Sequence, residues 1–330
     1  MHKAEVDVGV LILFFNNPER LQQVFNRIKE ARPSKLFLYQ DGPRGGDDEP
    51  DIDTCRKIVE DVDWECETYK NYQEKNSGCD PSNYLAQKWA FSLTDKCIIF
   101  EDDSVPSVSF IRFCKEMLDR YENDERIMMI SGLNYEEVTE DIPYDYFFTT
   151  VNPIWGWASW KRVIDLWDVN YSFLDNPTTV MLMKNMLKAR KQNSGYIDFC
   201  RAHKSSGIAY YETILSSNMY LNSGLGIVPG RNMIHNIGFE GAAVHYTSPL
   251  ETMPKAQRRI FEMPTYELNG QIKHPDCIIE HYAYKDRAYS LLAINHPVKK
   301  FMRKIEGIWL MVRHKGVSGI ILKIIKEFNR

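Results

Sequence analysis

The sequence predicts an α/β fold with a mostly parallel, Rossmann-like central sheet and helices on both of its faces. Over residues 1–130, short apolar runs alternate with amphipathic stretches, which is the pattern of strands joined by crossover helices. The runs are apolar on both faces and are bounded by Asn, Pro or Gly, as in strands buried inside a sheet. Acidic residues directly follow two of the runs, at the edge where ligands bind in such sheets.

The individual elements of this first part follow from local pattern. The first helix begins after Pro18 and places Leu21, Val24, Phe25 and Ile28 on one face. By the same reasoning we expect strands at 8–15, 35–39, 68–72, 96–100 and 126–130, and helices at 19–31, 54–62, 82–93 and 109–121.

After about residue 131 the alternation is weaker. We expect a strand at 144–150, a helix ending at 167 after an aromatic-rich stretch at 153–160, helices at 178–191 and 210–221, an extended segment at 226–229, and a loop at 231–250. Residues 251–295 give weak signals, whereas 301–312 and 317–328 have helical apolar periodicity and are separated by Gly316 and Gly319. The predicted organisation is a domain of residues 1–250, in two halves of 1–130 and 131–250, and an extension of 251–330.

Composition excludes several classes of protein. Of the 330 residues, 44% are hydrophobic and 26% are charged, which is ordinary for a globular protein and excludes global disorder. The net charge of −4 gives no reason to expect nucleic acid as a ligand. The seven cysteines are odd in number and scattered without a CxxC pair, which favours a reducing compartment.

The charge is unevenly distributed along the chain. Residues 297–330 contain nine Lys or Arg and two Glu, so this tail carries +7 and the rest carries −11. Such a tail predicts a negatively charged partner. The apolar run at 8–15 is preceded by acids and is too short to span a bilayer. We therefore expect a cytoplasmic protein whose tail either lies at the inner face of the cell membrane or packs its apolar stripe on the domain.

The strongest chemical signal is the triplet Glu101-Asp102-Asp103, directly after the strand expected at 96–100. Carboxylates at this end of a strand can hold a hard divalent cation such as Mg²⁺ or Mn²⁺. The same residues could instead begin the next helix, whose N-terminus favours negative charge. The sequence alone leaves both interpretations open.

A second polar segment, Gln40-Asp41-Gly42-Pro43-Arg44, follows the strand expected at 35–39. Asp41 could accept hydrogen bonds from a base or ribose, and Arg44 could bind phosphate, although a plain turn has the same composition. No glycine-rich phosphate loop is visible, which disfavours dinucleotide-dependent oxidoreductases and P-loop NTPases.

Later candidates are single residues. His245 could complete a metal shell, although a lone histidine is more often structural. Glu212 is a carboxylate beside aromatics that could deprotonate a hydroxyl, or an acid favoured by its helix N-terminus. Trp155 and Trp157 could stack on a sugar, although aromatics usually belong to the core.

Taken in order, these motifs resemble nucleotide-sugar glycosyltransferases of the GT-A fold. The chain is most similar to bacterial enzymes related to N-acetylglucosaminyltransferase I, over roughly residues 6–248. The resemblance rests on a series of segments that appear in the family's order: Phe15–Arg20, Tyr39–Arg44, Lys75–Cys79, Ile98–Pro106 with an EDD form of the DxD motif, Ile130–Asn134, Trp155–Trp160 and Pro229–Phe239.

The resemblance implies an inverting, metal-dependent transfer of a hexosyl or N-acetylhexosaminyl group. The donor would be a nucleotide-diphosphate sugar, UDP-linked as the first expectation, and the acceptor a glycan or lipid-linked glycan hydroxyl in bacterial surface polysaccharide synthesis. Residues 1–130 would bind the nucleotide and 131–250 the acceptor. The implied roles are metal ligation by Asp103 and His245, nucleotide or sugar contact by Glu101 and Asp102, base contact by Asp41, and diphosphate contact by Arg20 and Arg44.

The catalytic base departs from the family pattern. Relatives often have Trp-Asp-Tyr-x-Trp late in the domain, where this sequence has Tyr211-Glu212-Thr213. Glu212 is therefore the expected base and Asp198 the reserve. Two alternatives remain: a non-catalytic protein that binds a nucleotide sugar or glycan, and a sugar nucleotidyltransferase. The latter class usually opens with a glycine-rich loop, which Asn16-Asn17-Pro18 does not resemble.

Overall fold

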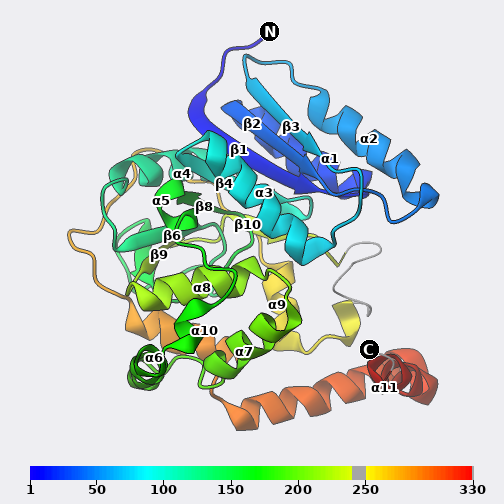
Figure 1. Cartoon of the computed structure of the whole chain (residues 1–330), viewed down its shortest axis with the longest axis vertical. Coiled ribbons are helices and arrows are strands. Elements are labelled where there is room, and N and C mark those ends of the chain that lie inside the picture. The colour runs from blue at the N-terminus through cyan, green and yellow to red at the C-terminus, as the bar shows by residue number, and fades with distance from the viewer. Residues whose placement is uncertain (240–249, 329–330) are drawn as a thin grey trace.

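The computed structural model describes the backbone of residues 1–239 and 250–328 and the side chains of residues 1–239 and 250–314. It has an α/β fold, as predicted, in which a large mixed sheet is flanked by helices and followed by a C-terminal helical region (Figure 1). The eight strands lie in the order β3-β2-β1-β4-β8-β6-β9-β7. Their bounds are β1 Val6–Phe14, β2 Pro33–Gln40, β3 Glu67–Tyr72, β4 Lys96–Glu101, β6 Ile127–Ser131, β7 Tyr146–Thr149, β8 Trp157–Trp160 and β9 Leu225–Pro229.

The first four strands form a parallel half-sheet. Strand β1 pairs with β2 on one side and β4 on the other, and β2 pairs with β3. Almost every residue of β1 is buried, because helices cover both faces. Helix α1 contacts α2 and α4, whereas α3 contacts α5 and α8. The helices are α1 Pro18–Ala31, α2 Glu49–Glu60, α3 Cys79–Leu93, α4 Val108–Arg120, α5 Lys161–Ile164, α6 Pro177–Ala189, α7 Tyr196–Ser206 and α8 Tyr211–Leu221.

The second half of the sheet is joined to the first by β8, which pairs antiparallel with both β4 and β6. This aromatic segment was expected to lead into a helix ending at Trp167, but that helix is the single turn α5. Strand β9 pairs parallel with β6 and antiparallel with β7. The sheet is therefore continuous across residue 131, where the alternation of the sequence changes.

A small ribbon lies beside the carboxyl end of β4. Strands β5 (Ser104–Pro106) and β10 (Ile234–Asn236) pair antiparallel, with Asn236 opposite Ser104. The expected loop at 231–250 thus contains a short strand within its described part. This pairing brings a segment late in the sequence against the EDD motif.

Residues 251–292 also pack on the domain. Helices α9 (Lys255–Glu262) and α10 (Tyr282–Leu292) contact each other, and α10 contacts β7. The Glu267 carboxylate accepts hydrogen bonds from the backbone N–H groups of Val108 (2.9 Å) and Ser109 (2.8 Å) at the start of α4. A backbone bridge joins Glu280 to Phe148 in β7. This part of the predicted extension is therefore held to the sheet by specific contacts.

The last long helix, α11 (Pro297–Phe328), runs along the side of the molecule opposite to β1–β3 and contacts the segment at 250–252 (Figure 1). Two helical stretches were expected here, and Gly316 does not interrupt the backbone of the helix. Within the described residues, no helix has the length and apolar character needed to cross a membrane. All seven cysteines are unpaired.

Candidate functional site: carboxylates at the end of β4

Five acidic side chains from three parts of the chain interact at the carboxyl end of β4, and we call them the acidic cluster: Asp80, Glu101, Asp102, Asp103 and Glu212. Asp80 is in the first turn of α3, and Glu212 is in the first turn of α8. The EDD triplet occupies the end of β4 and the turn into β5. Two helix N-termini therefore meet the triplet, and each carries a positive partial charge that favours anions.

Glu101 is the central member of the cluster. Burial raises its pKa above the ordinary range, and the negative charges of Asp103, Glu212 and Asp102 raise it further. The Asn83 side chain donates to Glu101 Oε2 over 3.5 Å and opposes this rise. Such a carboxyl group retains its proton at pH values where an exposed glutamate has lost it, unless a cation neutralises the cluster.

Asp102 connects the triplet to the end of β1. Its Oδ2 accepts a hydrogen bond from the Phe15 backbone N–H (3.2 Å), just beyond the end of β1. Burial and then the charge of Asp103 raise its pKa, whereas Phe15 and the Arg20 guanidinium lower it. Asp102 and Arg20 therefore join β4 to the start of α1.

Asp103 is held by the β5–β10 ribbon. Its Oδ1 accepts hydrogen bonds from Asn236 Nδ2 (3.2 Å) and Ser104 Oγ (3.2 Å), and its backbone oxygen accepts from the Ile237 N–H (2.8 Å). Gly238 provides the space for its carboxylate, because a β-carbon there would stand 2.5 Å from Asp103 Oδ2. The position of this carboxylate therefore depends on a segment that follows it by more than a hundred residues.

Glu212 is partly buried against the cluster. Burial raises its pKa to about 7, its own backbone N–H lowers it, and the charge of Asp80 raises it. The charge of Glu212 in turn contributes to the raised pKa of Glu101. A carboxyl group with a pKa near neutral pH can exchange a proton with a substrate at physiological pH.

The Asp41 carboxylate, which was expected to contact a base, accepts hydrogen bonds from backbone N–H groups of the protein. The donors are the N–H groups of Gly42 (3.0 Å), Ser77 (2.9 Å) and Gly78 (3.0 Å). Gly42 lies so close to the 75–78 loop that a β-carbon would stand 2.4 Å from the backbone carbon of Lys75. Asp41 thus fixes the loop that leads into α3.

Arg44 and Arg20, expected to contact a diphosphate, each have an acidic partner. Arg44 binds Asp48 through Nε (3.0 Å) and Nη2 (2.7 Å) and lies over the Phe15 ring. Asp48 also accepts from Asn16 Nδ2 over 2.6 Å, and the Arg44 hydrogen bond is the main cause that lowers its pKa to about 2. Arg20 is buried and acts electrostatically on Asp102.

The other expected site residues that the structure describes make contacts of their own. Trp157 is 1% exposed and stacks on Tyr211, so its ring is part of the core and offers no free face to a sugar. Trp155 is partly exposed and packs on Phe261, with ring centroids 4.7 Å apart. Asp198 is an exposed residue of α7, paired with Arg201 at 2.8 Å. His245 lies outside the described residues.

Three neighbours of the site were not identified from the sequence as functional residues. Asp80 follows the Lys75–Cys79 motif directly and precedes Pro81, so an acid in a helix first turn was the available signal. Asn236 and Gly238 lie in a segment noted only for its resemblance. No local pattern indicates that they contact Asp103, because that contact arises from the pairing of β10 with β5.

The donor atoms suit a hard cation that takes most of its ligands from substrate and water. Carboxylate oxygen is the preferred protein ligand of Mg²⁺, which usually takes one or two carboxylates together with phosphate oxygens. Among the described residues, no three His, Cys, Asp or Glu side chains are arranged to hold a metal by themselves. Asp103, whose Oδ2 lies in the space that Gly238 leaves, is the side chain that fits a single protein ligand.

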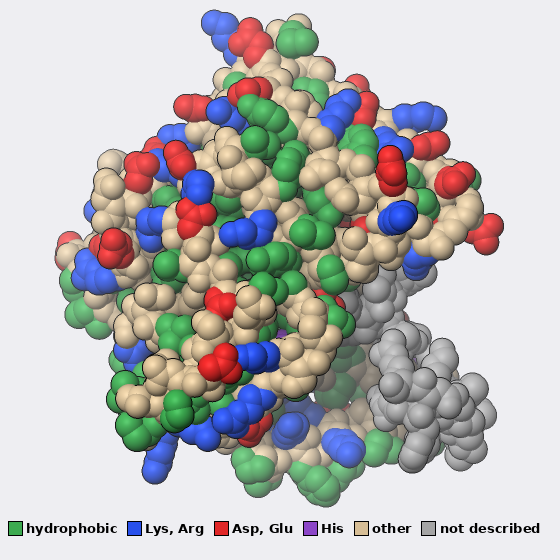
Figure 2. Space-filling model, viewed as in Figure 1, with side chains coloured by type: hydrophobic (Ala, Val, Ile, Leu, Met, Phe, Trp, Pro, Cys, Tyr) green, Lys and Arg blue, Asp and Glu red, His purple; other side chains and the backbone are tan. Residues whose placement is uncertain are grey.

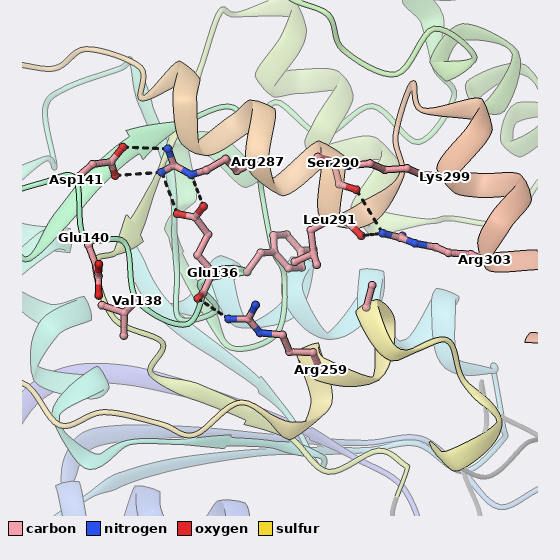
Figure 3. A pocket seen from close by; sticks show the side chains of 12 residues that line it. Glu136, Val138, Glu140, Asp141, Arg259, Arg287, Ser290, Leu291, Lys299 and Arg303 are labelled. Atoms are coloured by element: carbon pink, nitrogen blue, oxygen red, sulfur yellow. Dashed lines mark hydrogen bonds and ion pairs between the residues drawn. The ribbon is translucent and has the colours of Figure 1, made fainter. Parts of the chain in front are cut away.

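A cavity of about 760 Å³ lies away from this cluster, between α9, α10, α11 and the loop at 135–141 (Figure 3). Arg287 points into it and pairs with Glu136 and Asp141, while Arg303 reaches across from α11 to the end of α10. No member of the acidic cluster lines this cavity. Its charged groups connect the C-terminal helices to the domain.

Comparisons with known proteins add little to this geometry. No family model and no curated protein matches the sequence. Among solved structures, the glycosyltransferase GlyE of Streptococcus pneumoniae TIGR4 matches with 8% sequence identity and a TM-score of 0.28. The match covers 56% of this chain and 39% of that chain, so it spans well under half of that protein. A likeness at this level supports no conclusion about function.

Proposed function

We propose that this chain is a metal-dependent glycosyltransferase that moves a sugar from a nucleotide-diphosphate donor, UDP-linked as the first candidate, to a hydroxyl group of a glycan or lipid-linked glycan. The observation that carries the proposal is the approach of Glu212 to the EDD triplet. It brings a carboxyl group with a pKa near neutral pH to the edge of the sheet where a donor diphosphate would bind. The order of motifs in the sequence supports the same class.

The chain's own residues divide the work as follows. Glu212 accepts the proton of the acceptor hydroxyl group as the oxygen attacks the anomeric carbon of the donor. One carbon–oxygen bond forms while the bond to the diphosphate breaks on the opposite face, so the anomeric configuration is inverted. The N-terminus of α3 favours the negative charge that collects on the leaving group. A divalent cation, when bound, neutralises the diphosphate, and Asp103 would be its protein ligand.

The loop at 75–78 is a candidate to face the nucleotide. Asp41 holds the backbone N–H groups of Ser77 and Gly78, which immediately precede the first turn of α3. Arg44 and Asp48 brace the neighbouring turn. We therefore assign Asp41 and Arg44 to positioning this wall, and we propose direct contact with the nucleotide only through the backbone that they fix.

The test is a nucleotide-release assay on the full chain. The protein is incubated with Mn²⁺ and a panel of sugar nucleotides, with and without EDTA, and the products are resolved by anion-exchange chromatography. We expect slow release of a nucleoside diphosphate from one donor, and loss of that release in EDTA and in Asp103→Asn. Asp61→Asn is the matched control, because Asp61 is an exposed carboxylate that pairs with Lys29 and is not a member of the acidic cluster.

The alternatives give different products. A sugar nucleotidyltransferase would release pyrophosphate from a nucleoside triphosphate and a sugar phosphate, and not a diphosphate from a sugar nucleotide. A non-catalytic binding protein would show a thermal shift with one donor and no release. Either result, or the absence of any shift with every nucleotide and metal, would overturn the proposal.

A further inference from the structure

The first half of α11 has two unlike faces. Seven exposed apolar side chains recur every three or four residues, twice as adjacent pairs, and form a continuous stripe, which we call the α11 stripe: Val298, Phe301, Met302, Ile305, Ile308, Trp309 and Val312. Figure 2 shows hydrophobic side chains gathered along the outer edge of this helix. Phe301 is 63% exposed and Trp309 is 56% exposed, which is unusual for large apolar residues in such a row.

The opposite face of the helix is the one that contacts the domain. Met311 is buried, and a β-carbon on Gly307 would stand 3.7 Å from the Pro254 side chain. Arg303 donates to the backbone oxygens of Ser290 and Leu291 at the end of α10. Because these contacts fix the rotation of the helix about its axis, the α11 stripe is directed away from the domain.

The charges beside the stripe are positive. Lys300, Lys304 and Arg313 are exposed on the described part of the helix, and the Arg313 guanidinium lies over the Trp309 ring. The one acid in this part, Glu306, accepts a hydrogen bond from the Lys255 backbone N–H at the start of α9 and so faces the domain. The exposed surface of the helix therefore combines an apolar stripe with cationic flanks.

We propose that α11 lies in the interface of an anionic lipid bilayer, with its stripe among the acyl chains and its Lys and Arg side chains at the headgroups. The stripe runs along residues 298–312, about 21 Å of helix at 1.5 Å per residue, as expected for a helix that lies parallel to the surface. An acidic protein surface would satisfy the cations but would leave the seven apolar side chains in water. A bilayer satisfies both features together.

The proposal is tested by flotation of the full chain with vesicles of phosphatidylcholine alone or mixed with phosphatidylglycerol. We expect binding to the mixed vesicles, together with a blue shift of tryptophan fluorescence as Trp309 leaves water. Phe301→Ser with Ile305→Ser should weaken binding about tenfold or more, because several buried CH₂ groups are lost. Lys300→Gln with Lys304→Gln should weaken it about fivefold per charge, and only on anionic vesicles.

The matched control is Met181→Ser with Leu182→Ser, which removes two apolar side chains that are 53% and 59% exposed on α6. This variant should bind as the wild type does. Equal loss in the control and the stripe variant would overturn the proposal, as would failure of the wild type to float with mixed vesicles. A dimer by light scattering that the stripe variant converts to monomer, without vesicle binding, would assign the stripe to a second copy. Nucleotide release in solution is measured in parallel, so a failure here is distinguishable from failure of the proposed function.

Discussion

Gly238 leaves the space that the Asp103 carboxylate occupies, since a β-carbon on this glycine would stand 2.5 Å from Asp103 Oδ2. The backbone N–H of Gly238 donates to Asn236 Oδ1, and Asn236 in turn donates to Asp103 through its amide nitrogen. The segment after β10 therefore fixes both the place and the orientation of the proposed metal ligand.

We expect Gly238→Ala to displace Asp103 and to weaken Mn²⁺-dependent donor binding by about tenfold or more, because a ligand displaced by an ångström loses most of its contribution. The measurement is calorimetric titration of the donor in the presence of Mn²⁺. Gly46→Ala is the control, since no atom lies within 4 Å of a β-carbon there. Unchanged affinity in Gly238→Ala, with the fold intact by circular dichroism, would contradict the assignment of Asp103.

The raised pKa of Glu212 predicts how stability changes with pH. The folded protein binds the Glu212 proton more tightly than the unfolded chain, whose pKa is near 4.5, because burial raises the folded value to about 7. The free energy of unfolding therefore falls as pH rises from 4.5 to 7, and the loss of stability caused by ionising Glu212 is complete above 7. Glu212→Gln removes this cost and should raise the free energy of unfolding by ~2 kcal/mol at pH 8 and by little at pH 4.

Urea unfolding of the metal-free protein at the two pH values measures this difference. Glu251→Gln, a change in an exposed carboxylate, should show no such pH dependence. An equal effect of Glu212→Gln at pH 4 and pH 8 would show that the carboxyl group is not protonated in the folded protein near neutral pH. If Glu212 is also the base, the donor-to-acceptor rate should rise with pH through about 7 in the wild type.

Because Asp41 binds the backbone of the 75–78 loop, its substitution should destabilise that loop locally. An amide at this position keeps one acceptor oxygen but replaces the second with a donor, facing the N–H groups of Ser77 and Gly78. We expect Asp41→Asn to cost about 1–3 kcal/mol in the free energy of unfolding. Amide exchange at 75–78 should become faster, as measured by mass spectrometry, while exchange in β6 and β9 stays unchanged. Uniformly faster exchange would indicate global destabilisation and not a loop anchor.

The parallel half of the sheet was predictable because its determinants are local. The apolar run of β1 and the amphipathic pattern of α1 each specify an element without reference to the rest of the chain. Strand β8 was missed because its tryptophans fit a helix or a strand equally well. Its place between β4 and β6 is decided by pairing with segments about sixty and thirty residues earlier.

The candidate site likewise contains residues that the sequence identifies and residues that it does not. The EDD triplet and Asp41 were visible because each follows a recognisable strand, whereas their partners were not. Asp48 is local to Arg44, yet no pattern distinguishes it from Asp47. The exposure of the α11 stripe was left open by the sequence, since periodicity identifies an apolar face but not what covers it. The contacts of α11 with the domain, among them those of Arg303 and Glu306, decide which face is free.

A buried ion pair holds the C-terminal segment to the sheet. Lys285 Nζ lies 3.3 Å from Glu280 Oε1, and the two side chains are 1% and 7% exposed. Glu280 also accepts a hydrogen bond from the Thr150 backbone N–H, and Gln192 donates to the Thr150 hydroxyl group over 2.7 Å. The network joins α10 to the end of β7, and α10 in turn carries the carbonyl groups that bind Arg303 of α11.

We expect Lys285→Met to cost about 3–5 kcal/mol in the free energy of unfolding, because it leaves the charge of Glu280 buried without an opposite charge. Combining it with Glu280→Gln should recover most of that loss, since the amide keeps an acceptor for Thr150 and carries no charge. Lys191→Met is the control, because Lys191 pairs with Asp286 at 3.9 Å in an exposed position and should cost less than about 1 kcal/mol. Urea titration of the wild type, Lys285→Met, Glu280→Gln and the double variant measures the cycle. Additive losses in the double variant would mean that Lys285 and Glu280 stabilise the fold independently, so that the pair is not what fastens α10 to the sheet.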